Sequence, residues 1–382
     1  ALYGGIDFTK QYVNNATRHD YQVGSTFKPF VFAAAVDSDA TTQGGVPITA
    51  NTIYDGTNKR EVIGPGGGTG YAPENEDQVS YGPISAAAAM NASVNSVYAQ
   101  MAQDVGTKRV KRTAIELGLP ENTPNLTENP SMALGTATAS VLEMTSAYAT
   151  LANHGTHVAP WLVSKVTKDG NELSMPDRER RRAISREAAD ATTDVLRGVI
   201  EGPRGTGAAA RALGRPAAGK TGTAEEDKAA WFAAYTPQLA AVVAVMGQDP
   251  DPPYAQKPLY GAAGLPRING GGFPAEIWTA YMREALRGSP VQDFDLELPD
   301  GGYTPPPSSE PSTGPDPSED EPSTPPSEPP AGDGGTSNGE PGGTGTPPEG
   351  GTTDGGGATV GGPTNGGVDG GTTDGGSTNG GS

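Results

Sequence analysis

Cysteine is absent from this sequence of 382 residues. The absence excludes thiol catalysis, disulfide frameworks and cysteine-based zinc sites, and it is compatible with a location outside the cytoplasm. Histidine is scarce, and its three copies leave little material for a Ser-His-Asp triad. Long apolar runs are also lacking: the longest, Leu239 to Met246, is far shorter than the roughly 18 to 20 residues of a membrane-spanning helix.

Apolar and basic side chains are almost missing from the last part of the chain. Residues 301–382 contain 12 acidic residues and no Lys or Arg, so they hold 12 of the 19 excess negative charges and leave a net charge of −7 for residues 1–300. Such a stretch cannot bury enough apolar surface to offset its ordering entropy, and we predict a disordered tail. The first 300 or so residues are long enough for one large domain or two small ones.

The stretch GRPAAGKT, Gly214 to Thr221, matches the pattern of a phosphate-binding loop. Such a loop follows a buried strand and opens a helix, so that amide groups and the helix dipole converge on phosphate. Here residues 207–213 have the composition of a helix, and residues 231–235 and 239–246 have that of a β-hairpin. This context argues against nucleotide binding and leaves Lys220 for other chemistry.

A second motif, GSTFKPF, places Ser25 and Lys28 three residues apart. Pro29 lacks an N–H and is tolerated only near the start of a helix, so we predict Ser25 in the first helical turn with Lys28 beside it. A serine hydroxyl needs an adjacent base, and a lysine can act as one if desolvation or nearby cations keep it neutral. Taken alone, the pair is also typical of ordinary helix surface.

A third motif, SVN, places Ser93 and Asn95 between two predicted helices, residues 84–90 and 96–105. At such a joint, a hydroxyl and an amide can point into a cleft. They can equally cap the second helix, which is the commoner role for these residue types.

The order Ser-x-x-Lys, Ser-x-Asn, Lys-Thr-Gly is the signature set of penicillin-binding proteins and serine β-lactamases. Together with longer matching stretches, it makes residues 1–290 resemble the transpeptidase domain of class A penicillin-binding proteins. The resemblance is carried by GSTFKPF, YAPEN, YGPIS, SVNS, ALGTATASVLEMTSAYATLANHG, GTGAAAR, GKTGTAEEDKAAWFAAYTPQL and GGFPAEIWTAYM.

The resemblance implies an α+β fold, in which a five-stranded, mostly antiparallel sheet is covered by helices and an all-helical part lies on one side. It places this domain over residues 1–290 and a linker with the disordered tail over residues 291–382. In the family, a glycosyltransferase domain, a membrane anchor and the first strand of the sheet precede the segment that matches Ala1. We therefore expect a truncated domain that begins at a strand end, without these parts.

By the same resemblance, five residues are expected to catalyse the reaction. Ser25 is the acylated nucleophile, and Lys28 accepts its proton. Ser93 relays a proton to the leaving amine, with Lys220 near enough to tune it, and Asn95 holds the amide of the donor peptide.

The resemblance also implies a substrate-binding strand. Thr221, Gly222 and Thr223 bind the substrate, and the two threonines hold its terminal carboxylate beside Lys220. The backbone N–H groups of Ser25 and Thr223 form an oxyanion hole. No metal and no cofactor is expected.

The implied reaction is acyl transfer from peptidoglycan stem peptides that end in D-Ala–D-Ala, and β-lactams are expected to mimic that dipeptide. The resemblance places the protein at the extracytoplasmic face of the bacterial plasma membrane, anchored only through a preceding segment, with no nucleic-acid partner.

Rival functions are a D,D-carboxypeptidase or β-lactamase, in which water resolves the acyl-enzyme, and a β-lactam sensor that does not turn over. The oligomeric state and the acceptor amine stay open.

Two departures from the family pattern stand out. Ala229 occupies a position that is often acidic, for which we expect a local effect only, and Val94 replaces the Asp common in β-lactamases.

Three other features favour structural roles. His154 and His157 follow a predicted helix end and read as a surface loop rather than a metal site, and the arginine-rich run 178–186 reads as a solvated approach to a helix. The tryptophans are predicted to lie in the core: Trp161, Trp231 and Trp278.

Overall fold

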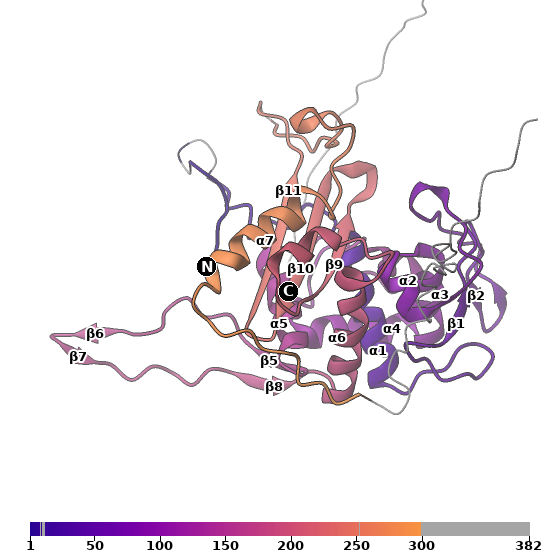
Figure 1. The fold of residues 1–382 in the computed structure, drawn as a ribbon, viewed down its shortest axis with the longest axis horizontal. Coiled ribbons are helices and arrows are strands. Elements are labelled where there is room, and N and C mark those ends of the chain that lie inside the picture. The colour runs from indigo at the N-terminus through magenta and orange to yellow at the C-terminus, as the bar shows by residue number, and fades with distance from the viewer. Residues whose placement is uncertain (8, 10–11, 252, 299–382) are drawn as a thin grey trace, which may run out of the picture. The chain divides into compact units, whose positions relative to one another are not determined.

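The computed structural model describes residues 1–298 except 8, 10, 11 and 252, all within the unit Ala1–Glu310 (Figure 1). The predicted tail therefore lies, from residue 299 on, outside the described residues, and the predicted boundary at residue 290 stays a prediction. The described α-helices are α1 Lys28–Asp37, α2 Ala86–Asn91, α3 Asn95–Val105, α4 Thr107–Leu117, α5 Val141–Ala152, α6 Arg186–Glu201 and α7 Phe273–Ala285. None of the helices in this part of the chain is both long and apolar enough to cross a bilayer.

The main sheet is antiparallel, with the strand order β11-β10-β9. Its strands are β9 Ala218–Thr223, β10 Ala229–Thr236 and β11 Leu239–Met246. The strands β10 and β11 form the predicted hairpin, closed by two residues between Thr236 and Leu239. Lys220 stands opposite Ala233, which puts the Lys-Thr-Gly motif on a strand rather than on a phosphate-binding loop.

Both faces of β10 are buried, because helices pack on each side of the sheet. Trp231 and Tyr235 belong to the main hydrophobic core, with residues of α1, α3 and α5. Phe232, on the opposite face, packs edge-on against Trp278 of α7, with 5.4 Å between the ring centroids. A strand apolar on both faces therefore fixes the sheet between two helical layers.

The mixed α and β fold is confirmed, but the sheet has three strands among the described residues, whereas the resemblance implies five, one of them missing. The expected strand end at residues 1–5 is irregular. These residues pair with no strand within the described part of the chain, and Tyr3 and Ile6 are 76% and 94% exposed. A strand without ladder partners has nothing to hold it extended against a sheet.

Four short two-stranded ladders complete the described part. They are β1 Ile53–Asp55 with β4 Pro83–Ser85, β2 Ile63–Gly64 with β3 Gly67–Gly68, β5 Thr156–Val158 with β8 Arg180–Arg182, and β6 Thr167–Lys168 with β7 Asn171–Glu172. Figure 1 shows β6 and β7 at the end of a ribbon that projects away from the helices.

Several local predictions need correction. Arg180–Arg182 form a strand instead of an approach to a helix, because they pair with β5, and α6 starts only after the N-cap of Ser185. The helix predicted over residues 84–90 begins at Ala86, since Ser85 caps it by accepting a hydrogen bond from the Ala88 N–H at 3.2 Å. Trp161 is only half-buried and is not a core residue, unlike Trp231 and Trp278.

The two clustered histidines lie after the end of α5, as predicted. His154 Nδ1 is 2.6 Å from a carboxylate oxygen of Asp190, and His157 Nδ1 is 3.0 Å from the Thr150 hydroxyl. His154 thus links the end of α5 to α6. His157 is buried in strand β5, so the predicted surface loop is wrong for this residue, because its ring packs against α5.

Candidate active site

Ser25 lies in a single 3₁₀ turn, Gly24–Phe27, that leads directly into α1. Gly24 has a φ of +58°, and a Cβ there would lie 2.4 Å from the carbonyl oxygen of Thr223. The close approach therefore requires glycine at this position. The turn Gly24–Phe27, called the serine turn below, thus starts in direct contact with the end of β9.

Lys28 is fully buried, and its Nζ contacts three polar side chains. It donates to Ser25 Oγ and, at 2.7 Å, to Asn95 Oδ1, and it lies 3.4 Å from Ser93 Oγ. The first two motifs of the sequence therefore meet around one ammonium or amine group, as predicted.

Ser93 lies between α2 and α3 with a φ of +58°, a conformation that is strained for a residue other than glycine. Val94 is the N-cap of α3 and makes no side-chain cap, so the alternative of a capping pair is not realised. Instead, Asn95 donates from Nδ2 to the carbonyl of Glu74 at 2.7 Å. The strained turn thus directs both polar side chains of the motif toward Lys28.

Lys220 reaches the same serine from the sheet. It is fully buried on β9, and its Nζ donates to Ser93 Oγ at 2.9 Å and to the carbonyl of Thr221 at 3.1 Å. Thr221 Oγ1 is 2.7 Å from the hydroxyl of Thr206. All three motifs therefore converge, with Ser93 standing between the two lysines.

Gly222 and Thr223 complete the strand beside the serine turn. A Cβ on Gly222 would lie 2.7 Å from the Val23 carbonyl and 3.1 Å from the Thr26 amide, so only glycine fits there. Thr223 is half-buried, and its carbonyl faces Gly24. The backbone of β9 and that of the serine turn are consequently held in contact.

Burial governs the charge of both lysines. Desolvation lowers the pKa of Lys28 well below its usual value, and the charge of Lys220 lowers it further. Desolvation also lowers the pKa of Lys220, to about 7. In both cases the carboxylate of Glu76 acts in the opposite direction. The shift of Lys28 favours the neutral amine next to the serine hydroxyl, which is the arrangement that activates a serine nucleophile.

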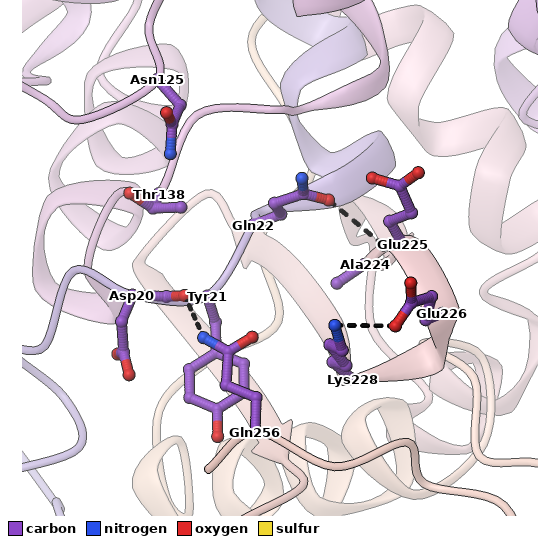
Figure 2. Close-up of a pocket in the computed structure, with 10 residues that line it drawn as sticks. All are labelled: Asp20, Tyr21, Gln22, Asn125, Thr138, Ala224, Glu225, Glu226, Lys228 and Gln256. Atoms are coloured by element: carbon purple, nitrogen blue, oxygen red, sulfur yellow. Dashed lines mark hydrogen bonds and ion pairs between the residues drawn. The ribbon is translucent and has the colours of Figure 1, made fainter. Parts of the chain in front are cut away.

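A pocket of about 180 Å³ adjoins this site at the end of β9. Figure 2 shows Gln22 and Glu225 side by side on its rim, and the Glu225 N–H donates to Gln22 Oε1 at 3.2 Å. Lys228, which also lines the pocket, pairs with Glu226 at 2.7 Å. The hydrogen bond between Gln22 and Glu225 therefore links the segment before Ser25 to the segment after Thr223, next to the contact between Gly24 and Thr223.

Sequence reasoning missed three residues around this site. Glu76, Arg267 and Thr206 carry no motif of their own, although Glu76 directly follows the matching stretch YAPEN. Glu76 influences both lysines, Arg267 pairs with Glu76 at 3.0 Å, and Thr206 contacts Thr221.

The model of the penicillin binding protein transpeptidase domain matches residues 3–263, which include all the residues of the three motifs. The chain belongs to the family of penicillin-binding protein transpeptidase domains. It is similar to penicillin-binding protein 1A of Neisseria lactamica, with 30% identity over 79% of this chain and 36% of the relative. The chain thus spans just over a third of the length of its curated relatives.

Solved structures of the family have the same fold. The penicillin-binding protein 1A of Haemophilus influenzae superposes with a TM-score of 0.65 at 23% identity, over 77% of this chain and 46% of that one. PonA1 of Mycobacterium tuberculosis, solved in complex with penicillin V, superposes with a TM-score of 0.63 at 26% identity, over 80% of each chain.

Proposed function

We propose that this transpeptidase domain is a serine D,D-transpeptidase that forms an acyl-enzyme on Ser25. The observation that carries the proposal is the position of Lys28 Nζ, which is buried and bonded to Ser25 Oγ with the charge of Lys220 nearby. A desolvated amine in contact with a hydroxyl is an effective general base. The sequence motifs and the family support the same chemistry.

In the first half of the reaction, Ser25 Oγ attacks the carbonyl carbon of the D-Ala–D-Ala bond while its proton moves to Lys28 Nζ. The resulting oxyanion accepts hydrogen bonds from the backbone N–H groups of Ser25 and Thr223, each of which contributes roughly 3 to 4 kcal/mol in comparable oxyanion holes. Ser93 Oγ passes a proton to the leaving nitrogen and regains one from Lys28 or Lys220. The C–N bond breaks, and D-alanine leaves with an ester on Ser25.

In the second half, an amine of a neighbouring stem peptide attacks the ester carbonyl. Its proton is transferred through Ser93 and Lys28 to the departing Ser25 oxygen, and the new amide is the crosslink. Asn95 holds the donor amide, and Thr221 and Thr223 bind the terminal carboxylate beside the cationic form of Lys220. Gly222, between these two threonines, belongs to the same substrate-binding strand, and its lack of a side chain lets this strand pack against the turn that carries Ser25.

The substrate class and location follow from the same proposal. The donor is a peptidoglycan stem ending in D-Ala–D-Ala, and β-lactams such as penicillin act as its mimics. The enzyme works at the extracytoplasmic face of a bacterial plasma membrane, where such stems are exposed.

The test is acylation by a fluorescent penicillin, followed on denaturing gels for the unaltered chain and for Ser25→Ala. We expect stable labelling that Ser25→Ala abolishes and that Thr9→Ala, an exposed control, retains. Mass spectrometry should locate the adduct on Ser25. Rapid release of the label would instead indicate a β-lactamase. Absence of labelling would contradict the proposed function.

A further inference from the structure

Two segments distant in the chain border the site described above. On one side, residues 71–76 lie against α3, where the carbonyl of Glu74 accepts from Asn95 and Asn75 Oδ1 accepts from the Ser96 N–H at 3.0 Å. On the other side, residues 225–227 form the turn that follows β9. The charge of Glu225 on this turn raises the pKa of Tyr71 on the first side, in addition to the effect of burial.

Arg267 joins these two sides directly. Its Nε donates to Asp227 Oδ1 at 2.8 Å, and its Nη2 lies 3.0 Å from Glu76 Oε1. The Arg267 side chain is about two-thirds buried, and the Asp227 side chain is only 9% exposed. A planar fork that donates from two nitrogens is suited to hold two carboxylates at once.

The segment that carries Arg267 is anchored to the sheet. Ile268 and Leu259 are buried against Ala230 of β10, and the Leu259 N–H donates to the carbonyl of Asp227 at 2.9 Å. Arg267 is therefore held by a segment that is packed on the sheet, and its ion pair with Glu76 is a contact across the site, in addition to that of Lys220 with Ser93.

The ion pair between Arg267 and Glu76 concerns the two lysines of the site, because the carboxylate of Glu76 raises the pKa of each of them. Glu76 pairs with Arg267, which lies in the segment before α7, and its charge acts on Lys28 of α1 and on Lys220 of β9. Its neighbour Glu74 pairs with Lys59 at 2.5 Å, and Asp227 shares Arg267 with it. An unpaired carboxylate at this position would favour the protonated form of both lysines more strongly.

We propose that Arg267 is a positioning residue that bridges the two sides of the substrate site and neutralises Glu76 beside Lys28 and Lys220. The inference rests on the proposed function, since it assigns Arg267 a role in keeping Lys28 able to accept the proton of Ser25. Arg267 does not touch the reacting atoms; it acts through Glu76 and through the separation of the two sides.

The experiment measures the rate of Ser25 acylation by a chromogenic or fluorescent penicillin as a function of pH. Arg267→Ala should lower the rate at neutral pH on the order of threefold to tenfold and move the rising limb of the profile to higher pH, because more Lys28 is protonated. Glu76→Gln should move the same limb to lower pH. The double variant should follow the profile of Glu76→Gln.

Two further variants separate charge from bridging and from stability. Arg267→Ala should also lower the maximal rate, because the two-pronged contact is lost. Arg267→Lys restores a positive charge but not this contact, so it should regain the pH profile while its maximal rate stays below that of the unaltered chain. Arg287→Ala, which removes an exposed arginine paired with Glu284, is the matched control and should behave as the unaltered chain. Thermal unfolding of each variant reports whether the fold is retained.

The outcomes distinguish the two proposals. If the unaltered chain is never acylated at Ser25, the proposed function is wrong. If it is acylated, but Arg267→Ala leaves the pH profile in place or moves it equally in the Glu76→Gln background, the neutralising role is wrong. Full recovery of the maximal rate by Arg267→Lys would contradict the bridging role.

Discussion

At the scale of single residues, the site depends on two lysines that the fold holds without exposure to water. Burying an ammonium group is costly, and the cost appears as lowered pKa values. A lysine whose folded-state pKa lies below its unfolded value weakens the fold at low pH, where both states bind the proton but only the folded state buries it. The penalty is relieved as the pH rises from the folded toward the unfolded pKa.

Replacement of Lys220 should therefore stabilise the protein at neutral pH. With a folded pKa of about 7 against the usual 10.5, Lys220→Met should raise the free energy of unfolding by about 1 to 4 kcal/mol near pH 7. The gain should shrink toward pH 10, where the wild-type lysine is neutral in the fold. Denaturant unfolding at several pH values checks this, and a gain that grows with pH would contradict it. Acylation should be lost at every pH.

The sequence allowed part of this site to be predicted from local rules. The proximity of Ser25 and Lys28 follows from helical spacing, and the position of Ser93 between helices follows from the apolar pattern. The contact of Lys220 with Ser93 spans 127 residues and came only from the family resemblance. Glu76 and Arg267 were missed because an ion pair between distant segments leaves no periodic signal in either of them.

At the scale of elements, the decisive contact joins the serine turn to β9. Gly24, Gly222 and Gly135 lie where backbone meets backbone, and a Cβ on Gly135 would lie 1.8 Å from the Gly24 carbonyl oxygen. No shift of a flexible side chain can relieve such clashes. The relative position of the two N–H groups of Ser25 and Thr223 is thus set by glycines rather than by hydrogen bonds alone.

Gly24→Ala should separate these two elements. We expect a loss of acylation of at least about tenfold, and destabilisation by roughly 1 to 3 kcal/mol from the positive φ and the clash together. Gly45→Ala is the matched control, since Gly45 has a φ of +78° and open space around its Cβ. It should cost only the backbone strain and leave acylation intact. Acylation kinetics and thermal unfolding of both variants make the comparison, and equal activity of the two would refute the argument.

Helices and strands were predicted well where the apolar pattern of the sequence is long. They were predicted poorly where pairing with a distant strand decides the secondary structure. The hairpin of β10 and β11 follows from two apolar runs around Pro237, and the start of α3 was placed within one residue. Arg180–Arg182 became a strand only because β5 lies beside them, and residues 1–5 formed none for want of a partner. The sequence of a segment does not show whether a distant strand lies beside it, so neither outcome could be predicted from the residues themselves.

At the scale of the whole molecule, the projecting ribbon of β6 and β7 lies, in the chain, between two parts of the proposed catalytic set. Ser25, Lys28, Ser93 and Asn95 all precede the ribbon in the chain, and Lys220 follows it. The side chains of residues 162–174 are exposed throughout, and they include Lys165 and Lys168. The core that unites the two halves is formed by α1, α3, α5, α6 and the sheet, all of which lie away from the ribbon.

Brief digestion with trypsin should therefore nick the protein between its two halves without disabling it. The severed pieces should co-elute on gel filtration and still capture penicillin together, while on a denaturing gel the fluorescence should travel with the N-terminal piece alone. Separated by denaturant, neither piece should capture the drug, because one supplies the serine and the other the second lysine. The molecule would then behave as an enzyme in two complementing parts.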